Sequence, residues 1–437
     1  MTTPVWDFVR RYASSGTLRL HMPGHKGVPV LGCEALDLTE VAGADSLYAP
    51  TGIIRESEAN AAALFGSVRT LYSTEGSSQC IRAMVHLALR HRAPGVPPVL
   101  LAGRNAHSSF LSACALCGAE PDWLWPEAGE GLLSCTLRPA ALEKQLDAAG
   151  TCCAAVYVTS PDYLGGMADV AGLAAVCHAR GLPLLVDNAH GAYLRFLPGA
   201  RHPLEQGADL VCDSAHKTLP VLTGGAWLHI ADEAYAPAAK QAMALFGSTS
   251  PSYLTLASLD LCNARLATDY PMLLAEAERD AAALRQTLLE LGWTVRPSDP
   301  LRITLQCDGA KAAARLRARN MEPEYAGPDA LVLMLTPENA AAARTRVPEA
   351  LGRCELPAPP PPPPLPRPER VCSVREALFA PQERRPAAAA LGCICGAPTV
   401  SCPPAVPIVA AGERIPPEAL PWFRAYGVES VDVLLCT

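Results

Sequence analysis

The sequence lacks the segments that would place it in or across a membrane. No apolar run approaches the ~20 residues of a membrane-spanning helix. The first residues, Met1-Thr2-Thr3-Pro4, do not show the basic and then apolar layout of a secretion signal. Lysine and arginine form no basic cluster and the formal net charge is −7, so no nucleic-acid-binding surface is expected. We therefore expect a cytoplasmic protein without a membrane or nucleic-acid partner.

The sequence also lacks a complete set of metal ligands, although it contains 17 cysteines. Cys114 and Cys117 have the spacing of a metal or redox pair, but apolar residues surround Cys114 and no second Cys-x-x-Cys pair or histidine-rich partner accompanies them. In a chain that is not exported, cysteines stay reduced. We expect these cysteines to be small buried hydrophobic residues and expect no bound metal.

The alternation of apolar runs predicts an α/β fold. The chain has 437 residues, half of them apolar, which is too long for one compact domain. Strand-like runs alternate with amphipathic helical runs up to about residue 255, as in a mainly parallel sheet covered by helices. The predicted strands of this sheet are 99–102, 154–159, 183–187, 209–213 and 226–230.

The remaining sequence predicts smaller parts. A long helix at 271–291 leads into strand-like runs at 301–305 and 330–335. A run of prolines follows, and it must be extended because proline lacks the amide donor that helices and sheets need. The predicted parts are an N-terminal arm and linker (1–55), a large domain (56–270), a small α+β domain (271–355), a proline-rich linker (356–370) and a C-terminal domain (371–437).

Two residues with reactive side chains lie at the carboxyl ends of predicted strands. Lys217 ends the segment Ser214-Ala215-His216-Lys217 directly after one apolar run, and Asp187 ends another. Ligands bind at the carboxyl ends of the strands in open parallel sheets. A lysine and a carboxylate are the groups that a pyridoxal phosphate (PLP) enzyme needs most. The lysine forms the Schiff base with the cofactor aldehyde, and the acid keeps the pyridine nitrogen protonated.

A third feature suits the phosphate of such a cofactor. Gly76, Ser77 and Ser78 precede apolar positions 80, 81, 84, 85 and 88, whose spacing predicts a helix. The N-terminus of a helix attracts anions through its free N–H groups and its dipole. His107 likewise follows the strand predicted at 99–102, so it lies beyond the same edge of the sheet.

Several motifs along residues 20–265 are similar, in order and spacing, to those of one enzyme family. They are His21-Met22-Pro23-Gly24-His25-Lys26-Gly27, Thr51-Gly52-Ile53-Ile54-Arg55-Glu56, Gly76-Ser77-Ser78, Arg104-Asn105-Ala106-His107-Ser108, Thr159-Ser160-Pro161-Asp162-Tyr163-Leu164-Gly165, Asp187-Asn188-Ala189-His190-Gly191 and Ser214-Ala215-His216-Lys217. The chain resembles the Orn/Lys/Arg decarboxylases of PLP fold type I, in the short form without an N-terminal wing domain. The resemblance implies an aminotransferase-like large domain with a mainly parallel sheet, a smaller α+β domain and a C-terminal appendage.

The resemblance also implies roles for the matching residues. Lys217 would be the Schiff-base lysine, Asp187 the partner of the pyridine nitrogen and His107 the imidazole stacked on the cofactor ring. The other implied cofactor-binding residues are Gly76, Ser77, Ser78, His190, Ser214 and His216. The implied activity is decarboxylation of arginine, lysine or ornithine to the corresponding amine, as in polyamine biosynthesis. The implied assembly is a homodimer or a larger even-numbered oligomer.

Some positions depart from the family pattern, including Ser108, Asn188 and the segment that ends at Ala397. Relatives tend to carry glutamate where Ala397 stands. A basic substrate needs an acidic partner for its distal cation, because a buried unpaired charge is unfavourable. The candidates for this acid are Asp45, Asp162, Glu413 or a group of the partner subunit.

Two alternatives remain open. Another fold type I reaction, such as aldol cleavage or transamination, would use the same cofactor residues. A catalytically silent relative with a regulatory role is the other, although Lys217, Asp187 and His107 are all present.

Overall fold

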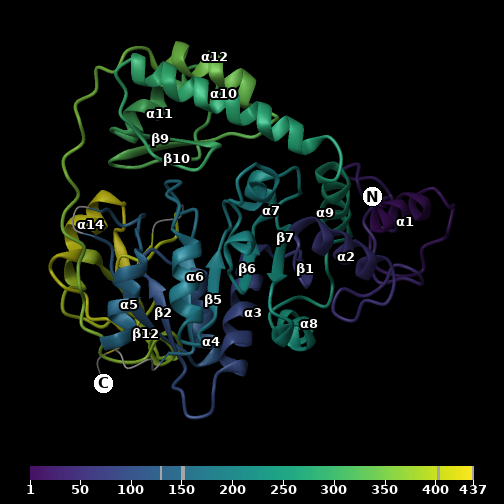
Figure 1. Ribbon diagram of the computed structural model, residues 1–437, viewed down its shortest axis with the longest axis horizontal. Helices are drawn as coiled ribbons and strands as arrows, with labels where there is room; N and C mark the ends of the chain where they lie inside the picture. The colour runs from purple at the N-terminus through teal and green to yellow at the C-terminus, as the bar shows by residue number, and fades with distance from the viewer. Residues whose placement is uncertain (128–129, 149–152, 401–403, 436–437) are drawn as a thin grey trace. The chain divides into compact units, whose positions relative to one another are not determined.

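The computed structural model describes residues 1–127, 130–148, 153–400 and 404–435 (Figure 1). Among these residues, no helix has both the length and the apolar character needed to cross a bilayer.

The chain forms two compact units, each made from separate stretches of sequence. The first unit contains residues 1–91 and 183–274, and the second contains residues 92–182 and 275–437. The division into five consecutive parts along the sequence stays a prediction.

The first unit carries four strands of the main, seven-stranded sheet, in the order β1-β7-β6-β5. Their bounds are β1 Arg69–Ser73, β5 Leu184–Asp187, β6 Leu210–Asp213 and β7 Ala226–Ile230. β5 and β6 are parallel, whereas β7 is antiparallel to both of its neighbours. Every residue of β5, β6 and β7 is buried, which explains why these strands read as continuous apolar runs.

The helices of the first unit are α1 Pro4–Ala13, α2 Ile53–Phe65, α3 Gly76–His91, α7 Ala215–Thr218, α8 Ala236–Ala244 and α9 Tyr253–Leu266. α3 packs against β6, β7 and α8. Its buried face includes Cys80, Ile81, Met84, Val85 and Ala88, as the helical spacing predicts. Burial of a side chain the size of Met84 or Val85 contributes roughly 1.5–3 kcal/mol to folding. The helix that begins with the Gly76-Ser77-Ser78 motif is therefore firmly anchored. Short 3₁₀ helices occupy Ala192–Phe196, Pro203–Gln206 and Glu233–Tyr235.

The second unit carries the other three strands of the main sheet, β2 Val99–Gly103, β3 Glu120–Leu124 and β4 Ala155–Thr159, in the order β4-β2-β3. β2 is parallel to both neighbours. The helices of this part are α4 Ser108–Cys117, α5 Pro139–Ala148 and α6 Val170–His178. Mixed α/β architecture with a mostly parallel sheet is thus confirmed.

Two strands of the main sheet, β1 and β3, are absent from the sequence prediction. They are the two ends of the strand order, so each has a neighbour on one side within the sheet. β1 contains Arg69 and Thr70, and β3 contains Glu120, Pro121 and Asp122. Proline and charged residues are tolerated at a sheet edge, where part of the backbone makes no ladder hydrogen bonds. Edge strands therefore lack the apolar signal that identified the central ones.

The second unit also contains the predicted small α+β part. Its sheet has the order β10-β11-β9-β8, with β8 Val295–Arg296, β9 Arg302–Gln306, β10 Tyr325–Ala326 and β11 Ala330–Met334. α11 (Gly309–Arg317) packs on β10 and β11, and α12 (Ala340–Leu351) packs on α11 (Figure 1). The predicted long helix is α10 (Tyr270–Glu290), which begins in the first unit.

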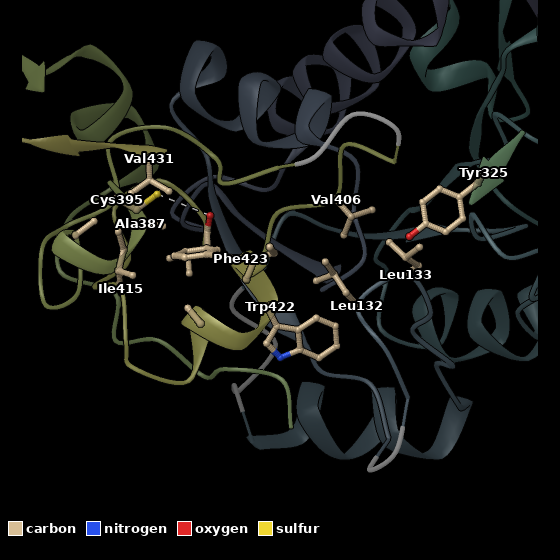
Figure 2. Packing of buried hydrophobic residues seen from close by; sticks show 14 of the residues in the cluster. Leu132, Leu133, Tyr325, Ala387, Cys395, Val406, Ile415, Trp422, Phe423 and Val431 are labelled. Carbon is tan, nitrogen blue, oxygen red and sulfur yellow. Dashed lines mark hydrogen bonds between the residues drawn. The ribbon is translucent and has the colours of Figure 1, made fainter. Parts of the chain in front are cut away.

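The C-terminal region packs into the hydrophobic core of the second unit. It contains α13 Val374–Phe379, β12 Gln382–Pro386, a 3₁₀ turn Ala387–Ala389, α14 Ala419–Ala425 and β13 Ser430–Leu434. Figure 2 shows Trp422 and Phe423 of α14 in a buried cluster that also holds Leu132, Leu133 and Tyr325. Residues of the C-terminal region therefore share one hydrophobic core with residues of earlier segments.

Candidate active site

The ends of β5 and β6 position two of the predicted catalytic residues. Asp187 is the last residue of β5, is almost fully buried, and pairs across the sheet with Cys212 of β6. Its Oδ1 accepts a hydrogen bond from the backbone N–H of Ala189 at 3.1 Å. Lys217 lies in the short helix α7 that follows β6, and its Nζ is 3.1 Å from Nε2 of His190. His190 lies three residues beyond Asp187, so the two strand ends do bring these groups to one place.

The predicted phosphate site is formed by the N-terminus of α3. Ser214 Oγ donates to Ser77 Oγ at 2.8 Å, which joins the segment before Lys217 to the first turn of the helix. Gly76 has φ +72°, a conformation that favours glycine, and its N–H donates to Gly224 O at 2.8 Å. A Cβ at Gly76 would meet no atom within 4 Å, so the space beside it is open.

This set of donors fits a phosphate group. The first turn of α3 contains two serines, Ser77 and Ser78, and no acidic residue. The helix has 16 residues and presents its N–H groups and the positive end of its dipole. The hydroxyls and the open space beside Gly76 suit the phosphate of PLP.

His216 is held within the same segment. Its Nδ1 lies 3.0 Å from the carbonyl oxygen of Gly225, which accepts the hydrogen bond. Burial, together with the positive charge of Lys217, lowers the pKa of His216 although the Gly225 carbonyl opposes the shift. The imidazole is therefore neutral near pH 7.

His107 belongs to the second unit, whereas the other predicted site residues belong to the first. It is the N-cap of α4, and its Nδ1 accepts a hydrogen bond from the N–H of Ser109 at 3.1 Å. Because Nδ1 acts as the acceptor, the proton of the neutral imidazole is on Nε2. Ser108, the residue after His107, is held by the C-terminal region, because its N–H donates to Ala405 O at 2.9 Å.

The three acids considered for the distal cation of a substrate are all engaged in their own units. Asp45 accepts from the N–H groups of Thr51 and Gly52, both at 2.8 Å, near the start of α2. Asp162 accepts from the N–H groups of Leu164 and Gly166. Burial raises the pKa of Asp162 to about 6 despite these hydrogen bonds.

Glu413, the third of these acids, forms a buried ion pair with Arg104 in the second unit. Glu413 Oε2 lies 3.4 Å from Arg104 Nη2, and Oε1 accepts from the indole N–H of Trp123 at 3.0 Å. Arg104 also donates to the carbonyls of Pro407 and Ile408 at 2.8 and 2.9 Å. The pair therefore ties the segment that presents His107 to the C-terminal region.

Replacing Glu413 with alanine is expected to destabilise the second unit by about 3–5 kcal/mol, because the Arg104 charge would stay buried without its partner. Urea unfolding followed by tryptophan fluorescence would measure the loss. Glu322→Ala is the matched control, since it removes an exposed partner of Arg317 and should leave unfolding almost unchanged. Equal unfolding midpoints for Glu413→Ala and the unsubstituted protein would contradict this role of the pair.

The Cys114–Cys117 pair shows no sign of a reactive site. Cys114 is fully buried in α4, and burial raises the pKa of Cys117 to about 11. A thiol with a raised pKa is neither a nucleophile nor a ready metal ligand at neutral pH. The packing role predicted for these cysteines fits their surroundings.

Comparisons with known proteins point to one family. The model of the Orn/Lys/Arg decarboxylase major domain matches residues 3–315. The uncharacterized protein YaaO of Bacillus subtilis is 34% identical over 326 residues, which are 70% of this chain and 65% of that protein. An arginine decarboxylase of Halalkalibacterium halodurans is 33% identical over 299 residues, which are 64% of this chain and 59% of that enzyme. The chain thus spans less than two thirds of the length of these two relatives.

Among solved structures, the lysine decarboxylase LdcF of Francisella novicida superimposes with a TM-score of 0.79 at 16% sequence identity. The superposition covers 99% of this chain and 81% of that enzyme. At this identity the match bears on the fold alone, and it confirms the predicted fold type I architecture.

Proposed function

Because this chain belongs to the Orn/Lys/Arg decarboxylase family, we propose that it is a PLP-dependent decarboxylase of a basic amino acid. The observation that supports the proposal best is the approach of Lys217 Nζ to within 3.1 Å of His190 Nε2, beside the strand end that carries Asp187. An amine, an imidazole and a buried carboxylate at adjacent strand ends are the groups that this chemistry requires.

Pyridoxal phosphate is the cofactor of this family, and the residues present fit it. Bound PLP supplies an electron sink for the electron pair that the departing CO₂ leaves behind. Lys217 would hold the aldehyde carbon, Asp187 would keep a proton on the pyridine nitrogen, and Ser77 and Ser78 would bind the phosphate. His107 takes the ring-stacking role that the family resemblance implies.

Proton handling at Lys217 follows from its surroundings. An ammonium group must lose a proton before it can act as a nucleophile. His190 Nε2, at 3.1 Å, is within range to accept that proton and to return it. Ser214, Gly76 and His216 keep the lysine segment against α3, so the amine is presented in one orientation.

The proposed substrates are arginine, lysine and ornithine. Since Asp45, Asp162 and Glu413 are occupied within their own units, we propose that the acid facing the distal cation comes from the partner subunit. The test is to load the protein with PLP and to measure CO₂ and amine formation from each of the three amino acids and from neutral amino acids. Release of CO₂ from at least one basic amino acid is expected. Activity on a neutral amino acid alone would refute the proposed substrate class.

We also propose a homodimer or larger even-numbered assembly, located in the cytoplasm. The arm that contains His21 and Lys26 carries solvent-exposed leucines, with Leu18, Leu20 and Leu31 exposed by 80, 86 and 87%. Several exposed leucines in one short segment of sequence are typical of a surface that another chain covers. The cytoplasm is proposed because the family's amino-acid substrates are found there.

Analytical ultracentrifugation is expected to find a dimer or larger even-numbered species, and replacing Leu20 and Leu31 together with serine should weaken it by removing apolar contact area. The matched control is Leu289→Ser, which alters an exposed leucine on α10 that belongs to the second unit and not to the arm. A fully active monomer would contradict the predicted assembly.

A further inference from the structure

A fully buried carboxylate, Asp213, is the shared hydrogen-bond acceptor for three side chains of the first unit. Asn188 Nδ2 donates to Asp213 Oδ1 at 2.6 Å. His202 Nε2 and His229 Nε2 each lie 3.1 Å from Asp213 Oδ2. None of the four residues has exposed surface. The proposed chemistry uses none of them, so this cluster needs an explanation of its own.

The protonation of the cluster can be assigned from its contacts. His202 Nδ1 accepts from the N–H of Leu204 at 3.3 Å, so the ring proton is on Nε2 and is donated to Asp213. Burial lowers the pKa of His229, although Asp213 opposes the shift, and the ring is neutral. Burial alone would raise the pKa of Asp213, but the two imidazoles hold it well below its usual range. The cluster is thus an ionised carboxylate surrounded by donors.

A metal ion is the alternative occupant. Ligand atoms of His202, Asp213 and His229 lie within 4.8 Å of one another, the sole such group in the described part of the chain. A neutral histidine that binds a metal through Nε2 must carry its proton on Nδ1. At His202 that nitrogen already accepts the Leu204 N–H, so the contacts favour the hydrogen-bonded cluster.

The cluster lies at the carboxyl ends of β5 and β6, the strands that precede His190 and Lys217. Asp213 is the last residue of β6, four residues before Lys217, and Asn188 directly follows Asp187 at the end of β5. Asn188 N also donates to Cys212 O at 2.9 Å, which continues the parallel pairing of Asp187 with Cys212. Successive side chains of a strand point to opposite faces. Anchoring Asn188 on one face therefore fixes the direction of Asp187 on the other.

We propose that Asp213 is a positioning residue that holds the ends of β5 and β6 in one register and so fixes Asp187 and Lys217 relative to each other. Apolar residues of similar volume would fill the same space without the penalty of burying a charge. Apolar residues would not fix one register of the two strands, whereas directional hydrogen bonds do. The proposal rests on the proposed function for the roles of Asp187 and Lys217.

The test compares Asp213→Asn, Asn188→Ala and the combined variant in the PLP-loaded protein. Each single variant is expected to lower kcat about 10- to 100-fold, the scale of a misplaced catalytic group. The combined variant should lose no more than the worse single one, because Asp213→Asn weakens and Asn188→Ala removes the same hydrogen bond. Multiplied losses would overturn the proposal.

The matched control is Thr70→Val. Thr70 Oγ1 lies 2.8 Å from His229 Nδ1, at the far side of the cluster from Asn188. This variant should lower stability but keep kcat within about twofold, since the Asn188–Asp213 bond remains. A loss of kcat equal to that of Asn188→Ala would mean that the cluster acts only through general stability, and would overturn the proposal.

Two further readouts do not depend on turnover. The circular dichroism of bound PLP should change in Asp213→Asn and Asn188→Ala but not in Thr70→Val. Amide hydrogen exchange at the ends of β5 and β6 should speed up in the same two variants of the cofactor-free protein. If the unsubstituted protein has no decarboxylase activity, the proposed function fails, while these two readouts still decide the positioning role.

Unchanged dichroism and exchange would overturn that role. One equivalent of tightly bound zinc in the purified protein, absent from the His229→Gln variant, would also overturn the positioning role. If Asp213→Asn does not fold, Asn188→Ala decides the question by the same criteria.

Discussion

Replacing Lys217 with alanine is expected to abolish decarboxylation, with kcat reduced by about 10⁴-fold or more. Lys217 Nζ is the amine that lies 3.1 Å from His190 Nε2, and an alanine side chain can neither bond to the cofactor aldehyde nor exchange a proton with His190. The near-visible absorbance band that PLP gains when a lysine holds it should disappear from the same preparation. Both readouts use the 437-residue chain with added PLP.

The control for Lys217 is the arginine variant, which keeps a positive charge at position 217. Since a guanidinium stays protonated, Lys217→Arg should be as inactive as Lys217→Ala while it keeps the fold. Normal far-ultraviolet circular dichroism of both variants would exclude unfolding as the cause. Appreciable turnover by either variant would refute the role given to this lysine.

Replacing Asp187 with alanine is expected to lower kcat by about 100- to 1000-fold, the scale seen when a preorganised charge is removed from an active site. In this variant the Asp187 carboxylate would no longer hold a proton on the pyridine nitrogen, so the cofactor would accept electrons poorly. The phosphate ligands proposed here, Ser77 and Ser78, are unchanged, so the variant should still bind some PLP. Steady-state kinetics with a parallel measurement of PLP content separates the two effects.

The conservative variant Asp187→Glu is the matched comparison for Asp187. It keeps the charge and should retain more activity than Asp187→Ala, although the longer side chain fits the buried strand end less well. Near-normal turnover by Asp187→Ala at full PLP occupancy would contradict the assigned role.

The sequence was sufficient to predict the central part of the main sheet and the positions of Lys217 and Asp187. Asp187 ends β5 and Lys217 follows β6, two strands whose every residue is buried, and such strands are visible as apolar runs. The Ser77–Ser214 contact could also be anticipated, because strand ends and the N-terminus of α3 meet at one edge of a sheet.

The Asp213 cluster could not be predicted in the same way. Its members at positions 188, 202, 213 and 229 follow no spacing rule, and only the tertiary fold brings them together. A signal was present in the sequence, since an aspartate at the end of a buried apolar strand requires partners. The sequence did not say which residues those partners were.

The carboxylates considered for the substrate cation illustrate a second limit of prediction from sequence. Asp45 and Asp162 accept hydrogen bonds from backbone N–H groups, and every residue type except proline carries such a group. Sequence patterns therefore do not reveal that these carboxylates are already engaged. Glu413 is similar, because its partner Arg104 lies about 300 positions earlier in the chain.

The arrangement of the two units has a consequence for the order in which the nascent chain can fold. All residues of the first unit have been synthesised once the ribosome reaches residue 274. Residues 92–182 are made before that point, but the segments beyond residue 370 that complete their core are translated after it. Since domains fold as units during synthesis, Arg104 has no Glu413 to pair with until about 300 further residues have been translated. Premature termination before residue 413 would therefore release a chain whose second unit exposes an unfinished core to chaperones and proteases.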